Sequence, residues 1–225
     1  MGDGRAGSRP REAGAWVGAT VVVLVVALVA NLYWPVRTDI RVFDADHMAR
    51  LDTDMWRSYY DKKPVALYFQ LGQLLRDEFH MTLARSYVTA FRAAHAAFVF
   101  KRGHARADYE RALPELERYF TDIHSISETP FDVDQAARTE LEWWIVHRER
   151  AVHAPGDLSR SLAVAAGALY RVDPARLGTY GDERAIAMTI RDDRQAAGGV
   201  SEADWSAIDA HLRRSWGALR SALHG

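Results

Sequence analysis

Residues 13–36 carry no charged side chain, and this run constrains the fold more than any other part of the chain. A helix of about 20 apolar residues crosses a hydrocarbon core of about 30 Å. Trp16 lies near one end of the run, and Tyr33 and Trp34 lie near the other. At about 1.5 Å per residue the two tryptophans are roughly 27 Å apart, so both reach headgroup level. We predict a transmembrane helix over residues 13–36, anchored in the bilayer by these three side chains.

Residues 1–12 are rich in glycine and arginine, and we expect a disordered tail there. A basic tail before an apolar run also describes a cleaved signal peptide, which is the alternative. The run is longer than the usual apolar region of about 7–15 residues, and no Ala-x-Ala site closes it. Both features favour an uncleaved anchor.

The arginines on the two sides of the run bear on its orientation. Three precede it and three follow it closely: Arg5, Arg9, Arg11, Arg37, Arg41 and Arg50. The α-amino group adds one positive charge to the tail, so the positive-inside rule favours a cytoplasmic N-terminus. The domain is then expected outside the cytoplasm, for example in a periplasm. Gly14 and Gly18 have the spacing that lets two membrane helices approach closely, although at the interfacial end of the run.

Residues 37–225 show apolar side chains at helical spacing almost throughout, and no alternating strand pattern. The last helix, opened by Ser201, has the clearest apolar stripe. Pro114 predicts a break near Leu113 within a helical stretch over 105–126. The connections are short, which favours antiparallel neighbours. We predict an all-α protein with one N-terminal transmembrane helix and a compact multi-helix bundle over residues 37–225. The other expected helices start near Asp44 or Asp46, at Pro64, Thr82, Asp132, Asp157 or Ser159, and Asp182, with a short helical turn from Asp173.

The helix predicted over 132–152 is apolar on nearly all sides at its centre, which indicates a helix surrounded by others. Glu140, Glu142, His147 and Arg148 interrupt that centre. We predict that these four form a buried polar network that fixes helix register, because unpaired charges there would cost several kcal/mol. Arg57 and Arg191 are further candidate members. The alternative is an acid–base set with pKa values shifted by burial.

His95 is the one histidine predicted to face the core, on a stripe with Val88, Phe91 and Phe98. A buried imidazole can ligate haem iron or a chlorin magnesium, or act as a base. A core histidine that donates a hydrogen bond to a neighbouring carboxylate is commoner, and we favour that interpretation. The sequence names no second axial ligand, so His95 is only a candidate cofactor-binding residue, without an assigned cofactor.

Several function classes are excluded or unsupported by the sequence. The absence of cysteine removes disulfides, thiolate metal sites and cysteine nucleophiles. The chain has no Glu-x-x-His motif, which a di-iron bundle site requires, and no phosphate loop or dinucleotide fingerprint. The net charge of −1 gives no basic excess for nucleic acid. No catalytic signature stands out, and we predict no metal or cofactor.

The pattern Phe131-Asp132, Glu140 to Trp144, Asp204-Trp205 and Ser215-Trp216 resembles that of uncharacterised bacterial single-span membrane proteins with a C-terminal helical domain. This resemblance covers most of the domain and implies no activity.

The expected function is therefore that of a membrane-anchored, non-catalytic accessory or scaffolding subunit. Its partners would be the lipid bilayer and other membrane-protein subunits. The layout is similar to that of small extra subunits in respiratory or photosynthetic complexes, which is analogy alone. The alternative is a membrane-tethered enzyme or cofactor-binding protein with a pocket around His95, Glu140 and His147.

Overall fold

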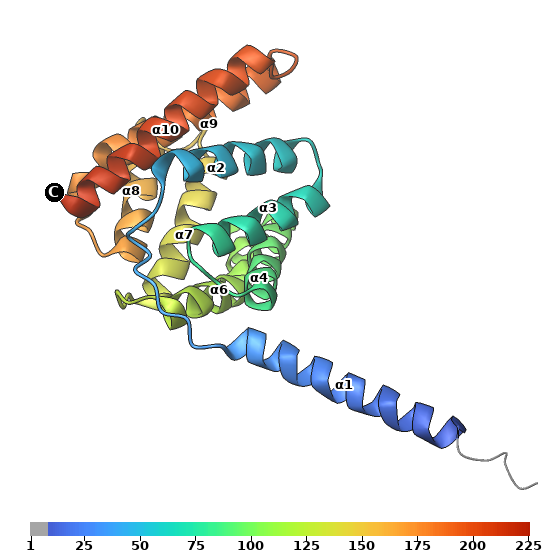
Figure 1. Cartoon of the computed structure of the whole chain (residues 1–225). Coiled ribbons are helices and arrows are strands. Elements are labelled where there is room, and N and C mark those ends of the chain that lie inside the picture. Colours follow the sequence, from blue (N-terminus) through green and yellow to red (C-terminus); the bar gives the residue numbers. More distant parts are fainter. Residues whose placement is uncertain (1–8) are drawn as a thin grey trace, which may run out of the picture.

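The computed structural model describes residues 9–225, and most of the predicted tail, residues 1–8, lies outside the described residues. Within the described part the fold is all-helical, with no strand beyond one bridge between Thr38 and Ser127. Figure 1 shows α1 projecting from a bundle that the other helices form. The elements are α1 (Arg9–Tyr33), α2 (Ala45–Tyr60), α3 (Pro64–Asp77), α4 (Leu83–Arg102), α5 (Arg106–Tyr109), η1 (Glu110–Ala112), α6 (Leu113–Ile126), α7 (Val133–Arg148), α8 (Asp157–Tyr170), η2 (Pro174–Leu177), α9 (Gly178–Ala196) and α10 (Glu202–His224). The predicted all-α architecture is confirmed.

Helix α1 contains most of the apolar run, residues 13–33, and has different bounds from those predicted. It begins at Arg9, four residues earlier, so residues 9–12 of the predicted disordered tail are helical. It ends at Tyr33 because Pro35 disfavours helical backbone at the residue before it. The window Trp16–Tyr33 is long and apolar enough to cross a membrane, a property that a signal sequence shares.

Local sequence signals fix several helix starts. Asp44 accepts hydrogen bonds from the backbone N–H groups of Asp46 and His47 at the start of α2. Ser201 forms a capping box with Asp204 at the start of α10, as its position in the sequence predicts. The stretch around Pro114 is divided into α5, η1 and α6, so the predicted break is confirmed.

Asp182 does not open a helix, which corrects its predicted role as a cap. The turn η2, which begins directly after Asp173 as predicted, runs straight into α9 at Gly178. Asp182 therefore lies inside α9, where its carboxylate accepts a hydrogen bond from the Ser159 hydroxyl of α8. Helix α7 ends at Arg148, before the predicted end at 152.

The connector between α1 and α2 is packed onto the bundle. Ile40 is fully buried and Phe43 is buried. The Thr38 N–H donates to the Ile126 carbonyl at 2.8 Å, and the Arg41 guanidinium donates to the Leu223 carbonyl at 2.9 Å. The connector therefore joins the C-terminal ends of α6 and α10. The largest fully buried apolar side chains of the bundle are Ile40, Met48, Leu75, Leu116, Ile123, Ile126, Leu177, Ile208, Leu212 and Leu219.

Helix α4 turns the opposite face to the core from the one predicted. Its buried residues are small: Ser86, Thr89, Ala90 and Ala96. The apolar stripe that periodicity assigned to the core is exposed, with Phe91 61% and Phe98 48% accessible. Small side chains let α4 pack closely against α3 and α6, and the Thr89 hydroxyl donates to the Asp122 carboxylate at 2.9 Å.

His95 belongs to that outward stripe, so the prediction that it faces the core is wrong. Its side chain is 49% exposed and lies 3.5 Å from the Glu115 carboxylate. Its ring stacks on Phe91, with the ring centroids 6.0 Å apart. An exposed imidazole paired in this way is a surface group and does not line the interior.

Candidate functional site

The centre of the bundle encloses a cavity of about 240 Å³ with ionisable groups in its wall. Asp52 comes from α2, Glu140 from α7 and Arg184 from α9. Apolar side chains and three tyrosines, Tyr119, Tyr170 and Tyr180, complete most of the lining. Charges in such surroundings need partners, and their arrangement decides what the cavity can bind.

Asp52 and Arg184 form a two-pronged ion pair whose oxygen–nitrogen distances are 2.5 and 3.2 Å. The Trp216 indole N–H donates to the same Asp52 carboxylate at 3.0 Å. The guanidinium also lies over the rings of Trp56 and Trp216, 5.5 and 5.6 Å from their centroids. Burial lowers the pKa of Arg184, but the hydrogen bond to Asp52 and the attraction of Asp52, Tyr180 and Glu140 together outweigh burial and raise that pKa above its ordinary value. Arg184 therefore stays charged.

Glu140 faces the same cavity without an ion-pair partner among the described residues. The Trp144 indole N–H donates to its carboxylate at 3.0 Å. Burial raises the pKa of Glu140, although the indole hydrogen bonds and Arg184 act in the opposite direction. Glu140 is thus a carboxyl group that keeps its proton to a higher pH than usual, beside a fixed positive charge. This arrangement suits proton transfer or hydrogen bonding to a polar ligand.

A second hollow of about 290 Å³ adjoins the first and shares Asp52, Glu140 and Arg184 with it. Tyr60 and His147 line only this second hollow. Of the three residues named for a pocket from the sequence, Glu140 and His147 thus line one hollow. His95 does not line either hollow.

His147 is held by a carboxylate at the edge of that hollow. Its Nε2 lies 3.1 Å from the Asp192 carboxylate, which also pairs with Arg150 and Arg191 at 2.9 Å each. Burial alone raises the pKa of Asp192, but its bonds to His147 and Arg191 hold that pKa below its ordinary value. Burial also raises the pKa of Tyr60 to about 12. Tyr60 therefore remains a neutral hydroxyl at physiological pH.

The predicted four-residue polar network is divided between the interior and the surface. Glu142 pairs with Arg106 at 2.6 Å, and Arg148 donates to the Lys101 carbonyl at 3.0 Å, both at the surface. Two residues along a helix turn a side chain by about 200°, so Glu142 points away from Glu140. Of the four predicted members, only Glu140 and His147 line the central hollows. Of the further members expected, Arg57 pairs with Glu202 and Arg191 with Asp192.

Asp52 and Arg184 were missed at the sequence level. Their separation of 132 residues hides the pairing. One signal was present: Asp52 lies four residues after Met48 and three before Met55, on the apolar face of α2. An ionisable residue at a core position of that kind predicts a buried partner.

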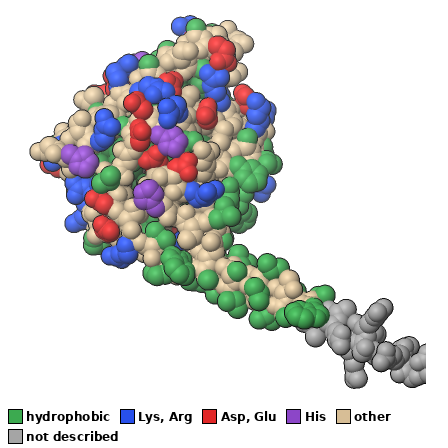
Figure 2. Space-filling view, in the orientation of Figure 1, with side chains coloured by type: hydrophobic (Ala, Val, Ile, Leu, Met, Phe, Trp, Pro, Cys, Tyr) green, Lys and Arg blue, Asp and Glu red, His purple; other side chains and the backbone are tan. Residues whose placement is uncertain are grey.

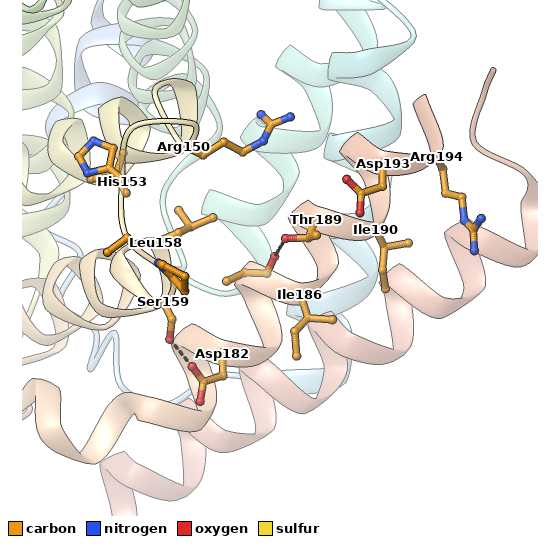
Figure 3. Close-up of a pocket in the computed structure, with 15 residues that line it drawn as sticks. Arg150, His153, Leu158, Ser159, Asp182, Ile186, Thr189, Ile190, Asp193 and Arg194 are labelled. Atoms are coloured by element: carbon orange, nitrogen blue, oxygen red, sulfur yellow. Dashed lines mark hydrogen bonds between the residues drawn. The ribbon is translucent and has the colours of Figure 1, made fainter. Parts of the chain in front are cut away.

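Figure 3 shows a surface groove of about 840 Å³ between the loop after α7 and helix α9. In this view His153 lies at the left, Asp193 and Arg194 lie at the right, and Arg150 lies above the space between them. The charged groups are spread along the groove and do not converge. Within the described residues no cluster of three histidines or carboxylates has the placement to hold a metal ion. The groove therefore lacks the convergent charged groups that line the central cavity, and it is the weaker candidate for a functional site.

The residues predicted to anchor or pair α1 are all exposed. Trp16, Tyr33 and Trp34 project from the helix and its end, with accessibilities between 60% and 79%. Apart from the neighbouring residues and backbone of α1 itself, no described atom would lie within 4 Å of a Cβ added to Gly14 or Gly18. This part of α1 has no packing partner in the described chain.

Comparison with known proteins found no matching family model, curated protein or solved structure. The resemblance to uncharacterised single-span bacterial proteins stays a prediction. The geometry of the chain is therefore the basis for a proposed function.

Proposed function

We propose that the protein is a membrane-anchored, non-catalytic accessory or scaffolding subunit of a larger membrane complex. The observation that carries this proposal is the exposure of α1: none of the window Trp16–Tyr33 is buried against the domain. An uncovered apolar surface of that length needs an apolar environment. A bilayer core supplies it, with Trp16 at one headgroup region and Tyr33 and Trp34 at the other.

The join between α1 and the domain supports a scaffolding role. The Asn31 side-chain oxygen accepts a hydrogen bond from the Ala84 N–H at 2.7 Å, and the Thr82 hydroxyl donates to the Asn31 carbonyl. The start of α4 is thereby fixed to the end of α1. Such a join holds the domain at a set height and angle to the bilayer, where neighbouring membrane subunits can meet it.

The proposal is tested by native purification of the full chain in mild detergent, followed by mass spectrometry. We expect larger membrane proteins to co-purify in fixed ratio, and the intact mass to retain residues 13–36. A matched control replaces residues 17–30 by leucine and alanine, which keeps the span and removes its specific surface. If the protein purifies as a monomer without partners under every extraction condition, the subunit proposal is contradicted. If the intact mass lacks residues 13–36, the apolar run is a cleaved signal peptide.

The proposed orientation places the N-terminus in the cytoplasm and the domain outside it. The chain has no cysteine, so a single Val152→Cys variant carries one thiol, at a side chain that is 82% exposed. We expect a membrane-impermeant maleimide to label this thiol from the extracytoplasmic side of intact spheroplasts. Labelling only after lysis reverses the orientation.

A second candidate function is a membrane-tethered enzyme or cofactor-binding protein that uses the central hollows. The specific observation in its favour is Glu140, a carboxyl with raised pKa beside the Asp52–Arg184 pair and in one pocket with His147. Glu140 would donate or accept the proton, Arg184 would hold an anionic or carbonyl group, and His147 would orient the outer part of a ligand.

This candidate is tested by spectroscopy, metal analysis and mass spectrometry of small molecules released from purified protein. We expect a bound compound whose occupancy falls in a Glu140→Gln variant. The matched control is Glu142→Gln, because Glu142 lies two residues away at the surface. A colourless, metal-free preparation that releases no small molecule contradicts this second function.

A further inference from the structure

Helix α4 is amphipathic with its large apolar residues on the outside. The outer stripe consists of Val88, Phe91, His95 and Phe98, which lie at helical spacing on one face. The three apolar members are 42–61% exposed, whereas the inward residues are alanine, serine and threonine. Burial of a phenylalanine gains about 1.5–3 kcal/mol, so an outward stripe of this kind is typical of a surface that contacts another apolar phase.

Helix α3 widens this stripe into a surface. Val65 and Phe69 of α3 are 67% and 54% exposed. The Phe69 ring packs edge-on against Tyr87 of α4, with the centroids 5.6 Å apart. The apolar surface therefore continues from one helix to the other. We call Val65, Phe69, Val88, Phe91 and Phe98 the α3–α4 face.

The α3–α4 face begins where α1 ends. Leu83, the first residue of α4, is 53% exposed and precedes Ala84, which is bonded to Asn31 of α1. In Figure 1, α1 appears along its whole length and α4 is strongly foreshortened, so α4 runs across the direction of α1. Figure 2 shows hydrophobic side chains along α1 and again at the adjoining edge of the domain. A bilayer crossed by α1 would meet this edge.

Basic side chains border the face at both ends. The chain has only three lysines, and all of them line one groove of about 190 Å³ with Phe98: Lys62, Lys63 and Lys101. At the other end Arg37, Arg85 and Arg92 line a hollow of about 390 Å³ with Tyr33, Trp34 and Val88. Lys63 pairs with Asp61 and Arg92 with Asp122, whereas Arg37 has no carboxylate partner among the described residues.

The border carboxylates Asp61 and Asp122 are paired with Lys63 and Arg92. Glu115 lies beneath His95, 3.5 Å from its ring, with 15% of its side chain exposed. An apolar stripe with aromatic residues and a basic border matches the chemistry of an anionic lipid surface, in which acyl chains meet the stripe and phosphates meet the cations.

We propose that the α3–α4 face lies in the headgroup interface of the bilayer that α1 crosses. The lysines and arginines that border the face then bind anionic phospholipid headgroups. This inference rests on the proposed membrane span. It gives the domain a second attachment and aligns α4 along the membrane surface.

The test is site-directed spin labelling of the full chain in nanodiscs, which the cysteine-free sequence makes direct. Single labels are placed at Phe91→Cys and Phe98→Cys on the face, at Val22→Cys within α1, and at Ile186→Cys on α9 as the exposed control. The measurement compares relaxation by oxygen, which concentrates in lipid, with relaxation by a water-soluble nickel chelate. We expect residues 91 and 98 to show interfacial depth, residue 22 to lie in the core and residue 186 to stay in water.

The outcomes separate this inference from the membrane span on which it rests. The inference is overturned, and the span left intact, if the labels at 91 and 98 are as water-exposed as the label at 186 while the label at 22 lies deep in the bilayer. A water-exposed label at 22 rejects the span itself. Labels at 91 and 98 that are immobilised but shielded from both oxygen and nickel indicate a protein contact, which also overturns the lipid surface.

A charge variant tests headgroup binding separately. We compare nanodiscs of phosphatidylcholine alone with nanodiscs that contain one-third phosphatidylglycerol. The depth of the label at 98 is expected to increase with the anionic lipid. The triple variant Lys62→Gln, Lys63→Gln, Lys101→Gln should lose this shift. A matched triple, Arg171→Gln, Arg176→Gln, Arg220→Gln, removes the same charge from other exposed positions and should keep it. Equal depth in both lipids overturns the headgroup assignment.

Discussion

At the residue scale, the ionisable groups that line the central cavity affect the stability of the fold in a way that depends on pH. Glu140 has a raised pKa because of burial. Below its ordinary value of 4.5 the carboxyl is protonated in both the folded and the unfolded chain, so it has no effect on stability. Above that value the unfolded chain loses its proton first, and folding becomes less favourable as the pH rises toward the folded-state pKa. We predict that Glu140→Gln is more stable than wild type at neutral pH, with the difference vanishing below pH 4.5.

Thermal unfolding followed by circular dichroism across this pH range measures the difference. Glu142→Gln is the matched control, because it removes a carboxylate that is 43% exposed and paired with Arg106. It should show no gain at neutral pH. A Glu140→Gln gain that is constant with pH contradicts the role of titration.

The Asp52–Arg184 pair gives a second prediction at this scale. Arg184→Met leaves the Asp52 carboxylate buried, with the Trp216 N–H as its only remaining donor among the described residues. Breaking a buried pair on one side typically costs about 3–5 kcal/mol. We predict a loss of this size in the free energy of unfolding, measured by denaturant titration of tryptophan fluorescence. Adding Asp52→Asn should recover most of it, since the uncompensated charge is then gone. A double variant as unstable as Arg184→Met alone would falsify this explanation.

The same residues show what sequence can reach. Glu140 and His147 are seven residues apart, two helical turns, so periodicity alone places them on one face. Asp52 and Arg184 meet only through the packing of α2 against α10 and of α10 against α9. A pairing of that kind depends on topology, which residue spacing within a helix does not specify.

At the element scale, local sequence patterns predicted where the helices form. They did not predict which side of a helix packs against the core. Periodicity found the stripe of α4, and the expectation that apolar residues turn inward placed that stripe in the core. The structure turns Ala90 and Ala96 inward because α3 and α6 leave little space beside α4. The hydrophobic signal is the same in either case. The side that faces the core depends on the neighbours, and this made the His95 assignment wrong.

Close helix packing also sets the third prediction, at the contact of α8 with α9. A Cβ on Gly181 would lie 2.2 Å from the Ser159 carbonyl oxygen, which is backbone and cannot move aside. Overpacking of this kind costs about 1–3 kcal/mol. Gly217 in α10 is the matched control, because a Cβ added there would have no described atom within 4 Å. We predict that Gly181→Ala destabilises the domain and that Gly217→Ala stabilises it by up to about 1 kcal/mol. Equal effects in thermal unfolding contradict the close contact.

At the scale of the whole molecule, the connector and the start of α4 join the apolar helix to the bundle. The structure buries Ile40 and Phe43 and bonds Thr38 to the end of α6. The domain therefore has a set direction relative to α1, which a scaffold held at a bilayer requires.

The final prediction concerns this fixed direction. One spin label is placed at Leu28→Cys in α1 and one at Ile186→Cys in α9, both exposed positions. Double electron–electron resonance in nanodiscs should then give one narrow distribution of distances between the two labels. Asn31→Ala removes the side-chain acceptor of the Ala84 N–H and should broaden that distribution. Thr20→Ala is the matched control, because the Thr20 hydroxyl donates only to Trp16 within α1. A broad distribution in the otherwise unchanged chain contradicts a rigid join. In that case α1 would act as a flexible tether, and the α3–α4 face alone would set the orientation of the domain relative to the membrane.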